Sequence, residues 1–248
     1  MIAVEAPAKL TWFLEVTGRR EDGYHEIRSE MATLRFGDRL LIDEEADYLR
    51  MEPAAGVSLD QSNLVRRALD LVGRTAGVTV EKVIPVGGGL GGGSADAAAI
   101  LRWSGGVSAV QALTLGGDVP FCQIGGRAMV EGVGELLTPL EFLARNVTLL
   151  IPAFSVDTGA CYRVFDELVA AGVKLNGRNH LEHAAGLVEP RLANTLGWLR
   201  SEFGEGVQLA GSGSTMFIEG HVAFSSADEY VEGPEGTVRL LQTTTSPR

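Results

Sequence analysis

The sequence predicts an α+β protein whose two halves pack together with a ligand site between them. Three observations support this prediction. Strand-like segments dominate the first fifty residues, a glycine-rich loop precedes an alanine-rich helical segment, and helical patterns over 159–203 are flanked by strand-like segments. A chain of 248 residues is long enough for one large core or two modest ones.

In the first half, the strand-like segments lead into the glycine-rich loop. The residues over 31–43 suggest a hairpin that turns at Phe36-Gly37-Asp38, and Ser62 is the expected cap of the first helix. The expected elements are strands over 9–16, 31–43 and 78–86, and helices over 63–73 and 94–103.

The second half begins near residue 141 with a buried-type strand that Pro152 ends. Two short strands flank the turn Gly211-Ser212-Gly213-Ser214, and one more strand begins near Gly236, ahead of a disordered end at 243–248. The expected elements are strands over 147–151, 207–210 and 215–219, and helices over 159–171, 180–187 and 191–203.

Composition and charge exclude several classes of function. The chain is 45% hydrophobic and 21% charged, as in ordinary globular proteins. Its net charge of −11 would repel nucleic acid and anionic membranes, so we expect neither as a partner. No basic leader precedes the first apolar residues, and no apolar run approaches the length of a membrane span, which indicates a cytoplasmic protein.

The residues that bind metals or form disulfides are sparse and scattered. Cys122 and Cys161 lie far apart and have no C-x-x-C partner, so we expect buried free thiols. No cluster of His, Cys, Asp and Glu suggests a fixed metal site.

The glycine loop over 85–96, PVGGGLGGGSAD, is the most informative local feature. Repeated glycines allow positive φ and a close approach of the backbone to a ligand. The helix that follows would present free N–H groups to an anion, of which phosphate is the most obvious, and the Ser94 hydroxyl could reach a phosphate oxygen or its Mg²⁺. The alternative is a flexible loop with Ser94 or Asp96 as a helix cap.

Two common phosphate loops are excluded. A Walker loop needs lysine before Ser94, where this chain has Gly93. A dinucleotide site needs a second strand with an acidic residue about 20 positions later, and the segment there, over 111–115, is followed only by the turn over 116–120. The loop is therefore predicted to bind phosphate in another way.

Three motifs in order resemble those of the GHMP small-molecule kinases. The glycine loop resembles their second motif, Pro7-Ala8-Lys9-Leu10 the first, and the segment over 209–215, LAGSGST, the third. Within this superfamily the chain is most similar to the 4-diphosphocytidyl-2-C-methylerythritol kinases. The segments that carry this closer resemblance are GRREDGYHEI over 18–27, LGGDVPF over 115–121 and the hairpin EGVGE over 131–135.

The resemblance implies a two-domain GHMP kinase fold. It places a ribosomal-protein-S5-like nucleotide domain at 1–140 and a ferredoxin-like domain at 141–248, with the substrate in the cleft between them. The implied reaction moves the γ-phosphate of ATP, with Mg²⁺ bound mainly through the nucleotide, to the 2-hydroxyl of 4-diphosphocytidyl-2-C-methylerythritol in the non-mevalonate isoprenoid pathway. The implied partner is a small molecule with a cytidine diphosphate group, and the chain would be a monomer or weak homodimer.

The resemblance also assigns roles to individual residues. Asp118 would take the proton of the substrate hydroxyl, and Lys9 would keep that carboxylate ionised. Tyr24 and His25 would contact cytidine, and Tyr162 would stack on the base. The residues implied for ATP are Asn63, Pro85, Gly87, Gly88, Gly89, Leu90, Gly91, Gly92, Gly93 and Ser94, and those implied for the substrate are Thr11, Tyr24, His25, Tyr162, Gly211 and Ser212.

From the residues alone, other interpretations stay open. Tyr162 fits an ordinary helix aromatic equally well, Tyr24-His25 a half-buried turn pair, Lys9 a solvated strand end, and Asp118 a turn residue. The chain also departs from the family pattern at Thr11 (usually Asn), Ala95 (Ser), Gly117 (Ala) and Met31 (aromatic), and it is short over 104–113. The alternatives are another GHMP kinase that acts on homoserine, mevalonate or a sugar, and a degenerate, non-catalytic nucleotide-binding protein.

Overall fold

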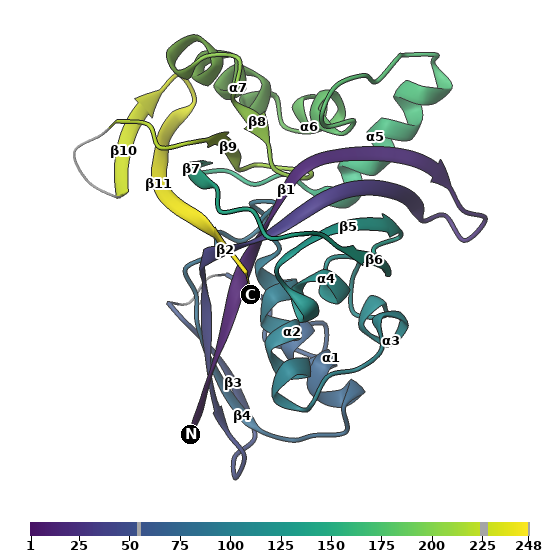
Figure 1. Cartoon of the computed structure of the whole chain (residues 1–248), viewed down its shortest axis with the longest axis vertical. Coiled ribbons are helices and arrows are strands. Elements are labelled where there is room, and N and C mark those ends of the chain that lie inside the picture. Colours follow the sequence, from purple (N-terminus) through teal and green to yellow (C-terminus); the bar gives the residue numbers. More distant parts are fainter. Residues whose placement is uncertain (54–55, 224–227, 248) are drawn as a thin grey trace.

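A computed structural model describes residues 1–53, 56–223 and 228–247, and it has the α+β architecture expected from the sequence (Figure 1). The strands are β1 (Ile2–Arg19), β2 (His25–Asp43), β3 (Tyr48–Glu52), β4 (Gly77–Glu81), β5 (Arg127–Gly132), β6 (Leu136–Pro139), β7 (Asn146–Pro152), β8 (Gln208–Leu209), β9 (Met216–Glu219), β10 (Asp228–Gly233) and β11 (Gly236–Ser246). The helices are α1 (Leu64–Leu71), α2 (Gly92–Trp103), α3 (Ala109–Leu113), α4 (Val119–Ile124), α5 (Thr158–Ala170), α6 (Glu182–Val188) and α7 (Pro190–Phe203).

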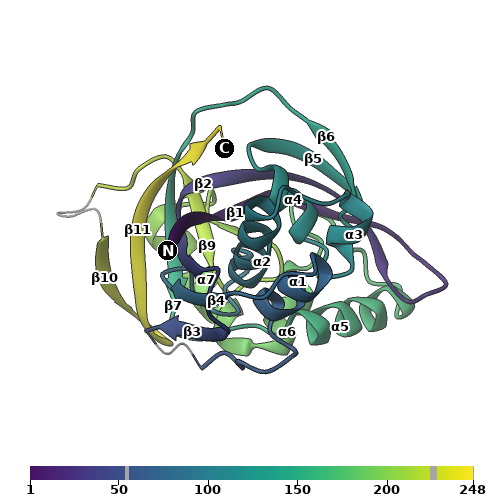
Figure 2. The same ribbon diagram turned by 90° about the horizontal axis from the view of Figure 1, so that it is seen from below.

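The long antiparallel ribbon of β1 and β2 is the centre of the fold. Figure 1 shows α1 to α4 on one side of this ribbon and α5 to α7 on the other. The strands order as β3-β4-β2-β11-β7-β9-β8, with β1, β5 and β10 as further partners of β2 and β11. Seen from below, α1, α2 and α4 lie next to one another over the ribbon (Figure 2).

Two hydrophobic clusters fill the protein, and β7 contributes to both. Val147, Leu149 and Ile151 point into the cluster that contains α2, whereas Leu150 points into the cluster of α5 to α7. The alternation of a strand thus places one face of β7 against each cluster. The predicted domain boundary between residues 140 and 141 stays a prediction.

The predicted hairpin at Phe36-Gly37-Asp38 is wrong, because β2 continues through these residues without a turn. Gly37 allows a close crossing instead. A Cβ at Gly37 would lie 2.5 Å from Cα of Pro7 on β1, so only glycine fits there. The hairpin predicted over 131–135 is present as the β5–β6 pair.

The predicted strand over 78–86 ends early, at Glu81. The next residues leave the sheet because the backbone N–H groups of Val83 and Ile84 donate to Oδ1 of Asp38, at 2.6 and 2.8 Å.

The cap predicted for the first helix is also wrong. Asn63 caps α1, with its Oδ1 accepting from the Val65 N–H at 2.9 Å, while Ser62 donates its hydroxyl to Asp60.

The predicted disorder over 243–248 is wrong through Ser246, and Arg248 lies outside the described residues. The late part of β11 pairs with β7 as far as Thr244 opposite Asn146, and then with β2. The Thr245 hydroxyl accepts from the Arg145 N–H at 2.9 Å and donates to the Leu143 carbonyl at 2.7 Å, so a polar segment becomes ordered by tertiary hydrogen bonds.

The strands predicted over 9–16 and 31–43 begin earlier than expected, at Ile2 and His25, and the other predicted helices and strands occur within about two residues of their expected ends. Both cysteines are free and buried, as predicted. Among the described residues, no helix has the length and apolar character needed to cross a membrane.

Candidate active site

The glycine loop enters α2 without any side-chain cap. Gly91 is the N-cap residue at φ 70°, and Gly87 and Gly89 also have positive φ, which residues with a side chain rarely adopt. No side chain caps the first turn of α2, so neither Ser94 nor Asp96 plays the capping role considered above. The N–H groups of this turn therefore remain available to an anion, together with the positive end of the helix dipole.

A second glycine turn, Gly211-Ser212-Gly213, packs directly on the glycine loop. A Cβ at Gly89 would lie 2.3 Å from the carbonyl oxygen of Ala210, and the Thr215 N–H donates to the Gly88 carbonyl at 3.1 Å. The two turns thus meet backbone to backbone, and together they form a glycine cradle that lines the cavity described below.

Lys9 and Asp118 form an ion pair beside this cradle. The Lys9 ammonium lies 3.2 Å from Oδ2 of Asp118 and donates to the Thr11 hydroxyl at 3.0 Å. Its side chain is 6% exposed and that of Asp118 is 32% exposed, so the carboxylate has access to solvent and the ammonium does not. The Lys9 N–H bonds to the Leu90 carbonyl at 3.0 Å, which fixes β1 to the glycine loop.

An aromatic cluster lies at another part of the same cavity. The His25 ring stacks on Tyr162 with centroids 4.6 Å apart and an interplanar angle of 23°, and its Nε2 lies 2.6 Å from Oδ1 of Asp166. Burial raises the pKa of the Tyr162 phenol far above its usual range, and the charge of Asp118 adds to that shift. Tyr24 is 62% exposed at the rim.

A single cavity of about 900 Å³ joins these groups. Of the residues predicted for the site, it is lined by Lys9, Tyr24, His25, Asn63, Pro85, Gly87, Gly88, Gly89, Gly91, Gly92, Gly93, Ser94, Asp118, Tyr162, Gly211 and Ser212. Thr11 and Leu90 do not line it. The Thr11 hydroxyl accepts from Lys9, and Leu90 is fully buried in the core behind the loop.

The structure also locates the departures from the family pattern. Ala95 is fully buried in the α2 core and not on the cavity wall, and Met31 lines the cavity. A Cβ at Gly117 would lie 2.8 Å from the Val133 carbonyl oxygen, so the alanine usual in the family would crowd the β5–β6 hairpin here. The short segment over 104–113 forms only the one-turn helix α3.

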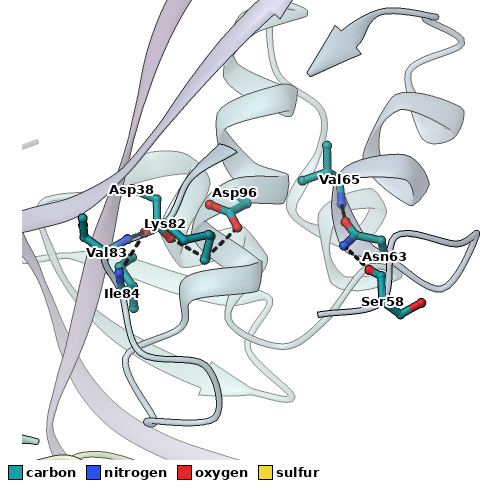
Figure 3. A network of polar contacts seen from close by, with 8 residues as sticks. All are labelled: Asp38, Ser58, Asn63, Val65, Lys82, Val83, Ile84 and Asp96. Carbon is teal, nitrogen blue, oxygen red and sulfur yellow. Dashed lines mark hydrogen bonds and ion pairs between the residues drawn. The ribbon is translucent and has the colours of Figure 1, made fainter. Parts of the chain in front are cut away.

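A buried charge cluster under the glycine loop was missed by sequence reasoning (Figure 3). Lys82 donates to Oδ2 of Asp38 at 2.5 Å and to Oδ2 of Asp96 at 2.8 Å. Burial raises the pKa of Asp96 to about 7, although the attraction of Lys82 opposes this shift. Burial lowers the pKa of Lys82, but the two carboxylates outweigh it and the net shift is upward. Because the three residues come from β2, the residue after β4, and α2, no local spacing reveals them.

Asp166 is a further residue that sequence reasoning missed. Besides its contact with His25, its Oδ2 lies 3.3 Å from the Arg19 guanidinium. The i, i+4 spacing of Tyr162 and Asp166 on the helical pattern is the one signal that could have pointed to it.

The glycine cradle lies at the N-terminus of α2, and one cavity joins it to the Lys9–Asp118 pair. An anion site beside a carboxylate is what phosphoryl transfer to an alcohol requires. Residues 63–126 match the family described as GHMP kinases N terminal domain. The fold is similar to that of a mevalonate kinase crystal structure, with a TM-score of 0.58 at 14% identity, covering 100% of both chains.

The similarity to one kinase group is higher. The chain is 35% identical over 242 residues to the 4-diphosphocytidyl-2-C-methyl-D-erythritol kinase of Methylibium petroleiphilum (87% of this chain, 84% of the relative). It is 38% identical over 231 residues to that of Paracoccus denitrificans (86% and 84%). A crystal structure of 4-(cytidine 5'-diphospho)-2C-methyl-D-erythritol kinase superposes with a TM-score of 0.71 at 31% identity, covering 99% of this chain and 100% of that one. The chain belongs to the 4-diphosphocytidyl-2-C-methyl-D-erythritol kinase family, and it is an ATP-dependent small-molecule kinase.

Proposed function

We propose that the chain phosphorylates the 2-hydroxyl of 4-diphosphocytidyl-2-C-methyl-D-erythritol with ATP, a step of the non-mevalonate isoprenoid pathway. The observation that supports this most is the Lys9–Asp118 pair at 3.2 Å, which shares one cavity with the glycine cradle and the aromatic cluster. In this proposal the glycine cradle takes the triphosphate, the Lys9–Asp118 pair takes the hydroxyl, and the aromatic cluster takes the nucleobase.

Asp118 is the proposed proton acceptor. The substrate oxygen attacks the γ-phosphorus, the bond from that phosphorus to the β,γ-bridging oxygen breaks, ADP leaves, and the hydroxyl proton passes to Asp118. The Lys9 ammonium, held by Asp118 and Thr11, keeps the carboxylate oriented and lies close enough to the cradle to attract the transferring phosphoryl group.

The backbone of the glycine loop is the proposed holder of the triphosphate. Its fit rests on the first turn of α2, whose N–H groups no side chain caps, and on the glycine residues that line the cavity before it. Mg²⁺, bound mainly through the triphosphate, would neutralise phosphate charge, and the Ser94 hydroxyl in the first turn of α2 is the side-chain oxygen that could hold it. Asn63 lines the cavity. It accepts from the Val65 N–H of α1 and donates to the Ser58 carbonyl, and these two bonds would fix that wall beside the nucleotide.

The aromatic cluster is the proposed cytidine site. Tyr162 and His25 provide a stacked pair of rings, and Tyr24 provides an exposed ring at the rim. Gly211 and Ser212 line the cavity from the second glycine turn, and we propose that they contact the substrate there. We also propose that the protein acts in the cytoplasm, where ATP is available and where its two buried thiols stay reduced. A monomer or weak homodimer stays the prediction for its assembly.

An ATP-consumption assay against a panel of acceptors tests the proposal. The panel holds the cytidine diphosphate substrate, homoserine, mevalonate and galactose, and we expect turnover with the first compound alone. Turnover of another acceptor without the first would contradict the substrate assignment. ATP binding without turnover of any acceptor would favour a non-catalytic nucleotide-binding protein.

A further inference from the structure

We propose that Asp166 is a positioning residue that makes His25 select cytosine over uracil. This inference rests on the proposed function, because it takes the aromatic cluster as the place where the base binds. It concerns a residue that contacts neither ATP nor the reacting hydroxyl in the proposed reaction.

The His25 ring is held on three sides by one helix. Tyr162 stacks on one face, with ring centroids 4.6 Å apart. Phe165 packs edge-to-face, with centroids 6.0 Å apart and an interplanar angle of 90°. Oδ1 of Asp166 lies 2.6 Å from Nε2. All three lie on α5, at i, i+3 and i+4, so they share one face of that helix. The imidazole therefore has little freedom to turn.

The Asp166 carboxylate is itself oriented. Its Oδ2 faces the Arg19 guanidinium at 3.3 Å, which leaves Oδ1 for His25. The start of α5 is fixed as well, because Asp157 caps it through the Ala160 N–H. The Arg19 contact and the helix cap thus fix the position of Asp166, and with it the contact between its Oδ1 and Nε2 of His25.

This contact decides which nitrogen of a neutral His25 carries the proton. An ionised carboxylate can only accept, so Nε2 must donate, and Nδ1 is left as an acceptor. Nδ1 has no hydrogen-bond partner within the described parts of the chain, and His25 is among the residues that line the cavity. A base that binds there meets a lone pair.

Cytosine and uracil differ at that point. The exocyclic N4 amino group is the one donor on the base-pairing edge of cytosine, and uracil has the O4 carbonyl in its place. In the same pose, Nδ1 accepts a hydrogen bond from the N4 amino group of cytosine. With uracil, the lone pair of Nδ1 would face the lone pairs of O4, and the two would repel each other. A site built for such a hydrogen bond discriminates strongly against an analogue that lacks the donor.

The test compares binding of cytidine diphosphate and uridine diphosphate by calorimetry, with a non-hydrolysable ATP analogue filling the nucleotide site. We expect the wild type to prefer cytidine diphosphate by at least about tenfold. In Asp166→Asn the amide can donate to Nε2 and permit the other tautomer, so this preference should fall by about tenfold. The matched control is Glu167→Gln, which removes the same charge from an exposed neighbour on α5 and should keep the preference.

Long-range ¹H–¹⁵N NMR of the wild type reports the His25 tautomer without any variant, with His25→Gln identifying the signal. A proton on Nε2 supports the proposal, and a neutral ring with its proton on Nδ1 overturns it. Equal wild-type affinity for the two diphosphates, or an unchanged preference in Asp166→Asn, also overturns it. Binding needs no turnover, so failure of the proposed kinase activity in the acceptor panel is a separate result.

Discussion

Replacing Asp118 by asparagine is the sharpest test of the proposed chemistry. The amide keeps an oxygen near the Lys9 ammonium, which also retains its bond to Thr11 at 3.0 Å, so the local packing should persist. Loss of a general base lowers kcat by about 10² to 10⁴, which corresponds to about 3 to 5 kcal/mol in the barrier. The glycine cradle is untouched, so the Kd for ATP should change by less than about threefold.

The cost in stability should be small in comparison. A charge-assisted bond becomes a neutral one, which removes about 1 kcal/mol at most because Asp118 is one-third exposed. This corresponds to about 2 to 4 °C in Tm for a chain of this size. Asp70→Asn on α1, an exposed residue, carries the same charge change as a control. A kcat for Asp118→Asn within about threefold of wild type, measured in the ATP-consumption assay, would refute the assignment of the base.

Three further predictions follow from the loop, the charge cluster and the thiols. Gly89→Ala places a Cβ 2.3 Å from the Ala210 carbonyl oxygen, at a residue whose φ is +77°, so the Kd for ATP should rise at least about tenfold. Gly197 has open space around it, so the control variant Gly197→Ala should leave the Kd unchanged. The pKa of Asp96 is raised from 3.8 to about 7. Between these two pH values, Asp96 therefore keeps its proton in the native state but has lost it in the unfolded state. The free energy of unfolding contributed by this group therefore falls as pH rises from about 4 to 7, and urea unfolding at several pH values should show a smaller fall in Asp96→Asn. Burial raises the pKa of both Cys122 and Cys161 to about 12, so native protein should resist iodoacetamide while unfolded protein reacts at both thiols; rapid native labelling would contradict this.

Local sequence patterns predicted the parts of the site that are contiguous in the chain. The glycine loop, the helix after it and the turn at Gly211-Ser212-Gly213 are all where the sequence places them. Their conformations depend on glycine and on neighbours a few residues away, so the spacing of residues carries the information.

Features that depend on distant partners could not be predicted in this way. Gly37 has the signature of a turn, yet it serves the crossing of Pro7 some thirty residues earlier. Asp166 and Asp96 are acidic residues within helices, and such residues are usually solvated. Their role depends on His25 and Lys82, which the tertiary fold brings to them.

The pairing of the late part of β11 with β2 has a consequence for the order of synthesis. Ser246 lies opposite Thr33, and Thr33 lies opposite Lys9 on the other edge of β2. The strand beside the proposed catalytic lysine therefore gains its last neighbour only after residue 246 has left the ribosome. A nascent chain that already contains the glycine loop, Asp118 and the second glycine turn still lacks this support, so the site is completed after translation of almost all of the sequence shown.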